Sequence, residues 1–187
     1  VSSTVYSLSG TNGGTCSANS QFTLAVVPLP SLTLTASNAT ICSGFTTALI
    51  ATGATNYTWD PGTITGSNVV VSPTVTTTYT LTGESNGCST TSTLLITVNP
   101  LPTVTANASP TIICVGLTTT LTAGGATSYT WLPGLQTGSS FTDAPLATQI
   151  YSVIGLDANN CPNIAAVTVS VLPSPTVIVA ASPTAIC

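Results

Sequence analysis

The chain has 187 residues and contains no Lys, Arg or His, so its formal net charge of −4 comes from four acidic residues alone. Nucleic-acid binding and polybasic membrane patches both require basic side chains, so the composition excludes these two functions. Because acid–base groups other than four scattered carboxylates are lacking, and no His could activate a Cys or Ser, the sequence predicts that the protein is not an enzyme.

The composition favours β-structure. β-Branched Thr and Val are abundant, whereas long straight-chain helix formers such as Glu, Lys and Met are nearly absent. The most apolar stretch, residues 164–181, is interrupted by Thr, Ser and Pro, and no signal-peptide pattern opens the sequence. We therefore expect an all-β protein without membrane insertion, from an internal or mature part of its chain.

The sequence repeats itself after 72 residues. "GATNYTWDPG" at 53–62 returns as "GATSYTWLPG" at 125–134, and "TICSG" at 40–44 returns as "IICVG" at 112–116. A period of this length predicts a tandem array with one domain in each repeat.

In chain order, the array has four parts. Residues 1–28 correspond to the last two strands of a truncated repeat, 29–100 and 101–173 are complete repeats, and 174–187 correspond to the first strand of a further truncated repeat. Because an isolated pair of strands is not a stable domain, we expect the protein to continue in both directions.

Within the first complete repeat, apolar residues alternate with Thr, Ser or Asn in short segments separated by Gly-, Pro- and Asn-containing turns. This pattern is typical of half-buried antiparallel strands. The predicted strands span residues 31–37, 39–42, 45–52, 55–60, 67–72, 77–83 and 89–98. Strands of this length and spacing predict a β-sandwich.

Closely spaced prolines separate the repeats, as "PLP" at 28–30 and 100–102 and as "PSP" at 173–175. Proline fixes its φ angle and favours extended chain, so these segments predict short, stiff joints and a rod-shaped array.

Each complete repeat has one Trp and one equivalent Tyr that we expect in the core: Trp59, Trp131, Tyr79 and Tyr151. The alternative for the Trp residues is stacking on a sugar. Asp60, Asp143 and Asp157 are the candidate calcium ligands, but the acidic residues do not cluster as a calcium site would require, so no metal or other cofactor is predicted.

The pattern "ICxG…GATxYTWxPG…NGC…VxPxPTV" resembles the Ig-like and PKD-like repeats of giant secreted surface adhesins of Bacteroidota, which include gliding-motility adhesins and use type IX secretion. The resemblance covers the whole chain. Trp59 and Trp131 match the core Trp of the family, and Tyr79 and Tyr151 match the Tyr that enters its penultimate strand. It implies tandem Ig-like antiparallel β-sandwich repeats of about 72 residues that form a rod, located outside the cell or at the bacterial cell surface.

The six cysteines form two series. Three follow the first strand of a repeat: Cys42, Cys114 and Cys187. Three follow the penultimate strand: Cys16, Cys88 and Cys161. Without His or a CxxC motif, zinc binding is not expected, and repeated cysteines in a secreted array predict disulfides.

The two series should lie at opposite ends of an Ig-type sandwich, separated by about ten strand residues at about 3.3 Å each. Because a disulfide requires Cα atoms within about 7 Å, we favour a bond between Cys42 and Cys161 across the joint between repeats. The remaining cysteines would then pair outside the fragment. Pairing within a repeat (Cys42 with Cys88, Cys114 with Cys161) and reduced or interchain cysteines stay open.

Three functions are compatible with the sequence. The first is a structural or adhesive segment of a long extracellular fibre or adhesin stalk, whose partners are neighbouring repeats and possible further copies in a fibre. The second is a module that binds a glycan or protein, favoured by the difference between loops 62–68 and 134–140. The third is a spacer attached to a secreted enzyme.

Overall fold

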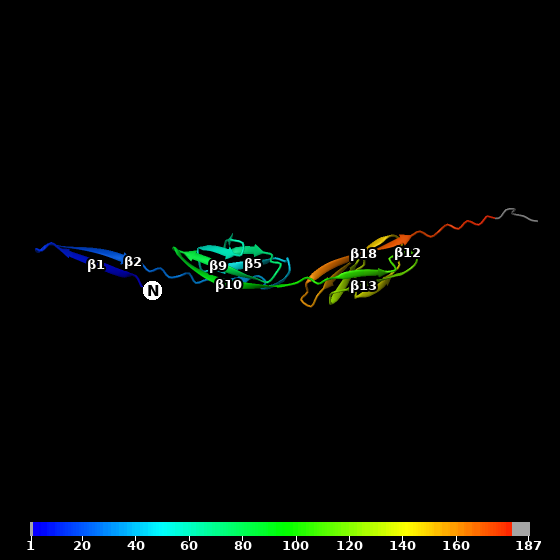
Figure 1. Ribbon diagram of the computed structural model, residues 1–187, viewed down its shortest axis with the longest axis horizontal. Helices are drawn as coiled ribbons and strands as arrows, with labels where there is room; N and C mark the ends of the chain where they lie inside the picture. Colours follow the sequence, from blue (N-terminus) through cyan, green and yellow to red (C-terminus); the bar gives the residue numbers. More distant parts are fainter. Residues whose placement is uncertain (1, 181–187) are drawn as a thin grey trace, which may run out of the picture. The chain divides into compact units, whose positions relative to one another are not determined.

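The structure is a computed structural model that describes residues 2–180, so the predicted disulfide cysteine Cys187 lies outside the described residues. It divides into two compact units between Asn99 and Pro100, directly before the "PLP" segment at 100–102. Both units consist of β-strands and loops (Figure 1). Within the described part, no helix is long and apolar enough to cross a membrane.

The first unit contains a sandwich of a five-stranded and a three-stranded sheet. The larger sheet has the order β4 (Thr40–Cys42), β10 (Cys88–Asn99), β9 (Thr77–Ser85), β6 (Asn56–Asp60) and β7 (Ile64–Thr65). The smaller sheet has the order β3 (Thr33–Ala36), β5 (Thr47–Thr52) and β8 (Asn68–Val71). β4 pairs parallel with β10, and the remaining pairs in this sandwich are antiparallel.

The second unit repeats this topology. Its larger sheet has the order β12 (Ile112–Cys114), β18 (Pro162–Leu172), β17 (Gln149–Leu156), β14 (Ser128–Leu132) and β15 (Gln136–Thr137). Its smaller sheet has the order β11 (Thr105–Ser109), β13 (Thr119–Gly124) and β16 (Ser140–Asp143). The predicted Ig-like, all-β sandwich is therefore confirmed.

All seven strands predicted for the first complete repeat are present, with ends that differ by a few residues. The sequence missed β7, and its equivalent β15 in the second unit, because each has only two residues. Two residues cannot display the alternation by which a strand is recognised.

A large aromatic residue anchors the core of each sandwich. Trp59 and Trp131 are both fully buried, and their indole Nε1 groups donate hydrogen bonds to the backbone oxygens of Gly66 and Gly138 at 3.0 and 3.1 Å. Burial leaves neither ring face accessible to a sugar, and the hydrogen bond offsets the desolvation of the buried N–H group. The structure thus places both tryptophans in the core.

Glycine is required at the start of each "GAT" turn. Gly53 and Gly125 have φ angles of 101° and 86°. A Cβ atom at either position would lie 1.8 Å from a backbone oxygen, that of Ser31 or that of Thr103. Any other side chain would therefore clash with the chain that enters the sandwich, which explains why both copies of the motif have glycine.

The first two strands, β1 (Thr4–Thr11) and β2 (Ser17–Leu24), form an antiparallel hairpin. Its register matches that of the β9–β10 hairpin: Tyr6 lies opposite Phe22, as Tyr79 lies opposite Leu94. The same local pattern of apolar residues thus produces the same hairpin.

The burial of this hairpin is entirely different. Tyr6, Leu8 and Leu24 are 56%, 74% and 48% exposed. Their equivalents in β9 and β10 are 5%, 0% and 0% exposed: Tyr79, Leu81 and Ile96. The β1–β2 hairpin therefore has the core face of a sandwich without the opposing sheet.

Residues 173–180 form no strand. The sequence led us to expect a first strand at 174–187. Strands form by pairing, and the described part of this segment has no paired neighbour; the rest, 181–187, lies outside the described residues.

Replacing one leucine in each hairpin tests the difference in burial. Leu81→Ala should lower the free energy of unfolding of the first sandwich by about 2–5 kcal/mol, because it leaves a cavity in the core. Leu8→Ala, at the equivalent exposed position, should change it by less than about 0.5 kcal/mol. The measurement is denaturant unfolding followed by Trp59 fluorescence in a Trp131→Phe background. Equal effects of the two substitutions would contradict the assignment of the core.

Candidate functional site

The register of the last strand determines where the cysteines of the first unit lie. Cys42 ends β4 and lies opposite Asn99, at the end of β10. Cys88 begins β10, a strand of 12 residues, and so lies roughly 35 Å away from this end at about 3.3 Å for each residue. This separation is far beyond the span of a disulfide.

The second unit has the same arrangement. Cys114 lies opposite Leu172 at the end of β18, whereas Cys161 directly precedes β18. The 11 residues of β18 again separate the two cysteines by roughly 35 Å. Neither complete repeat can close a disulfide on itself, so the alternative of pairing within a repeat is wrong.

The cysteines differ in chemical state. Cys16, Cys88 and Cys114 have free thiols; Cys16 and Cys114 are exposed and Cys88 is half-buried. Cys42 and Cys161 are disulfide-bonded. The disulfide cysteines thus include one member of each series.

The loops before β10 and β18 position their cysteines differently. Asn86 and Gly87 form a two-residue turn with φ angles of 51° and 77°, so Cys88 immediately enters β10. In the longer β17–β18 loop, the Asp157 carboxylate accepts hydrogen bonds from the backbone N–H groups of Asn159 and Cys161 at 2.8 and 2.9 Å. This carboxylate fixes the backbone at the fully buried Cys161.

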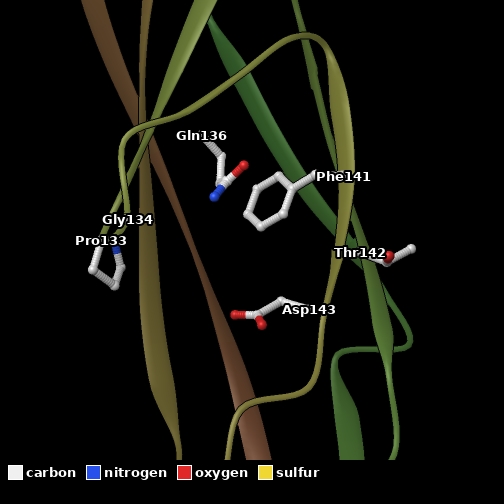
Figure 2. A pocket seen from close by; sticks show the side chains of 6 residues that line it. All are labelled: Pro133, Gly134, Gln136, Phe141, Thr142 and Asp143. Carbon is white, nitrogen blue, oxygen red and sulfur yellow. The ribbon is translucent and has the colours of Figure 1, made fainter.

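A second candidate site is a hollow of about 620 Å³ in the second unit. Six residues from β15, β16 and the preceding loop line it: Pro133, Gly134, Gln136, Phe141, Thr142 and Asp143. Figure 2 shows the side chains of Gln136, Phe141 and Asp143 directed into the hollow and that of Thr142 directed away from it. An amide, an aromatic ring and a carboxylate therefore converge.

Contacts with neighbouring residues fix the side chains of Phe141 and Asp143 in the hollow. Phe141 and Asp143 lie two residues apart on β16 and so share a face. The Phe141 ring forms T-shaped pairs with Trp131, at a centroid distance of 5.5 Å, and with Tyr151, at 6.2 Å. The Asp143 carboxylate accepts hydrogen bonds from the Tyr151 hydroxyl and from the Ala144 N–H group, so its orientation is fixed.

The electrostatics at this site keep Tyr151 a hydrogen-bond donor. Burial raises the pKa of the Tyr151 hydroxyl, and the hydrogen bond to Asp143 and its negative charge raise this pKa further. Burial also raises the pKa of Tyr79, at the equivalent position of the first unit. These effects favour the neutral Tyr151 hydroxyl, which donates its hydrogen bond to the carboxylate and holds it in place.

The first unit has aliphatic side chains where the pocket has functional ones. Ile64, Val69 and Val71 stand at the positions of Gln136, Phe141 and Asp143 in the 72-residue repeat. Val69 and Val71 belong to the buried core, and Ile64 packs against it. The functional groups of the pocket are therefore a property of the second repeat and not of the shared fold.

The sequence indicated only part of this site. It identified the loop at 134–140 as variable and considered Asp143 as a calcium ligand, but it did not identify Gln136 and Phe141. Comparison of the repeats position by position would have revealed the change from aliphatic to aromatic and acidic residues on β16. Among residues 2–180, no three Cys, Asp or Glu side chains gather in a group that could hold a metal ion.

The sequence matches no family model and no curated protein. Similar solved structures include an adhesin of an Antarctic bacterium, described as Ca²⁺-stabilized and as helping the bacterium bind ice: 14% identity, coverage of 93% of this chain and 58% of that chain, TM-score 0.45. Murine CEACAM1b has 12% identity, coverage of 76% and 100%, and a TM-score of 0.35. The Yersinia pseudotuberculosis adhesin InvE has 16% identity, coverage of 73% and 58%, and a TM-score of 0.28.

Stability at alkaline pH tests the environment of Tyr151. A raised pKa in the folded state means that this contribution to stability is complete below the unfolded pKa of about 10 and is lost as pH rises above it. The free energy of unfolding of the second unit should therefore fall above about pH 10. The slope should be smaller in Asp143→Asn, which removes the charge, and smallest in Tyr151→Phe. Urea unfolding followed by Trp131 fluorescence, in a Trp59→Phe background, measures it; an unchanged slope in Tyr151→Phe would refute the assignment.

Proposed function

We propose that the chain is a structural segment of a long extracellular fibre or adhesin stalk on a bacterial surface, and not an enzyme. The observation that supports this best is the β1–β2 hairpin. It has the register of β9–β10 but a bare core face, with Leu8 74% exposed where Leu81 is fully buried. A hairpin of this kind belongs in a further sandwich, so we infer that the two complete sandwiches are part of a longer array.

We propose for this array the boundaries that the sequence predicts. Residues 1–28 supply the last hairpin of one repeat, 29–100 and 101–173 are complete repeats, and 174–187 begin another. Each repeat would bury its own core, so the array can lengthen without changing its fold. The function of such a segment lies in its length and stiffness, with neighbouring repeats as its partners.

We further propose that Cys42 and Cys161 bond to each other across the joint between the complete repeats. Both are disulfide-bonded, and the register excludes partners within their own repeats. If every repeat bonds to its neighbour in this way, the remaining cysteines pair with cysteines of repeats outside this sequence: Cys16, Cys88, Cys114 and Cys187. Each such bond would stabilise its joint by about 2–4 kcal/mol and, with the prolines, stiffen a rod.

The absence of basic residues suits a surface fibre. Trypsin cleaves after Lys and Arg, and the chain contains neither. We assign the array to the repeat type that it resembles, the Ig-like and PKD-like repeats of secreted Bacteroidota adhesins that use type IX secretion. A spacer role beside an enzyme predicts a hydrolase domain in the full-length sequence, whereas an adhesin predicts many repeats and a sorting domain.

Disulfide mapping tests the joint. The unreduced chain is alkylated, digested with a protease that cleaves after aromatic residues, and examined by mass spectrometry. We expect a crosslinked peptide pair that contains Cys42 and Cys161, and alkylated Cys16, Cys88 and Cys114. A peptide pair that links Cys42 to Cys88, or alkylation of Cys42 in the wild type, would overturn the proposal.

Two matched Cys→Ser variants distinguish the loss of the disulfide at the joint from a general effect of removing a thiol. Cys161→Ser should leave Cys42 alkylated and broaden the distribution of particle lengths in small-angle scattering, because the joint loses its crosslink. Cys88→Ser should preserve both the crosslinked peptide and the scattering profile. If Cys161→Ser leaves the scattering profile unchanged, the disulfide does not stiffen the rod.

A further inference from the structure

The hollow beside β16 contains an uncompensated negative charge. The chain has no Lys, Arg or His, so no basic side chain of its own can neutralise the Asp143 carboxylate. Asp143 is nevertheless half-buried, where a charge without a partner is costly. The two groups that hold it, the Tyr151 hydroxyl and the Ala144 N–H, are both neutral donors.

The carboxylate keeps acceptor capacity for a ligand. Its Oδ1 atom accepts one hydrogen bond, from Ala144, and its Oδ2 atom accepts one, from Tyr151. Since a carboxylate oxygen has two lone pairs, each oxygen can accept another donor. A planar ligand with two parallel N–H groups can therefore bind Asp143 in a bidentate manner.

Two neighbouring groups complement such a ligand. Phe141, half-exposed and locked by Trp131 and Tyr151, directs its ring into the hollow (Figure 2). An aromatic ring attracts a cation within about 6 Å of its centroid. The exposed Gln136 offers an amide oxygen from the opposite side of the loop as a further acceptor.

We propose that this hollow binds the guanidinium group of an arginine side chain supplied by a different protein. Guanidinium is the group that combines a flat face for Phe141, paired N–H donors for Asp143 and the positive charge that the site lacks. A lysine ammonium group has the charge but neither the paired planar donors nor the flat face. Residues 1–187 of a second copy cannot supply this group, because they contain no Arg or Lys.

The site is specific to the second repeat. The first repeat has Ile64, Val69 and Val71 at the equivalent positions, which provide no charge, ring or amide. The proposal does not depend on the function as a fibre segment: an isolated pair of sandwiches would have the same hollow.

The test is an NMR titration of the ¹⁵N-labelled chain with N-acetyl-arginine methylamide. Its matched control is N-acetyl-citrulline methylamide, which has nearly the same shape without the charge. We expect shifts in the Ala144 and Gln136 signals with the arginine probe, about tenfold weaker binding of the citrulline probe, and weaker binding at high ionic strength. Equal binding of both probes, or shifts that lie elsewhere, would overturn the proposal.

Variants locate the interaction. Asp143→Asn should weaken binding of the arginine probe by about tenfold, and Phe141→Leu should weaken it several-fold. Asp60→Asn, which removes an exposed carboxylate of the first unit, should leave the affinity unchanged. If Asp143→Asn does not fold, the salt dependence and the citrulline control on the wild-type chain still decide the question. Saturable, salt-independent binding of methyl α-glucoside instead would assign the hollow to neutral sugars and refute a guanidinium site.

Discussion

The short parallel pairing of β4 with the end of β10, repeated between β12 and β18, determines which cysteines of this chain can form disulfides with one another. Because the pairing places the first cysteine of a repeat beside the end of its last strand, the other cysteine, at the beginning of that strand, lies a full strand length away. Three paired residues in each unit thereby fix the two thiol series at opposite ends of the last strand. A sandwich built in this way can form disulfides only with another unit or another chain, so no disulfide closes within a single sandwich.

The core makes this arrangement repeatable. Trp59 and Trp131 bury their rings completely and satisfy their N–H groups on the loop between the two short strands that follow. The indole thus ties that loop to the core, while Ser67 and Ser139, next to the two glycines, are exposed. Residues on either side of it differ between the repeats without loss of the fold: Ile64 and Val71 of one repeat correspond to Gln136 and Asp143 of the other.

The sequence predicted the strands, the sandwich and the opposite positions of the cysteines, because each follows from local alternation, turn residues and the 72-residue period. It could not predict β7 and β15, which are too short to alternate. It also missed the hollow. On β16, Phe141 and Asp143 look like ordinary alternating strand residues, and only the folded loop brings Gln136 towards them. The sequence also could not predict that Tyr6 and Leu8 are exposed. These two residues alternate with polar residues in the same way as the buried Tyr79 and Leu81.

The lack of basic residues connects the two proposals. A fibre made of many identical chains risks crosslinking wherever one copy carries a site that another copy can fill. A carboxylate with an aromatic neighbour is such a site for arginine, and residues 1–187 contain no arginine to occupy it. Within residues 1–187, therefore, no side chain of one copy can neutralise Asp143 of another, and the charge is available to a chemically different partner. The same absence leaves disulfides as the covalent crosslink between repeats, since crosslinks that consume a lysine amine cannot form.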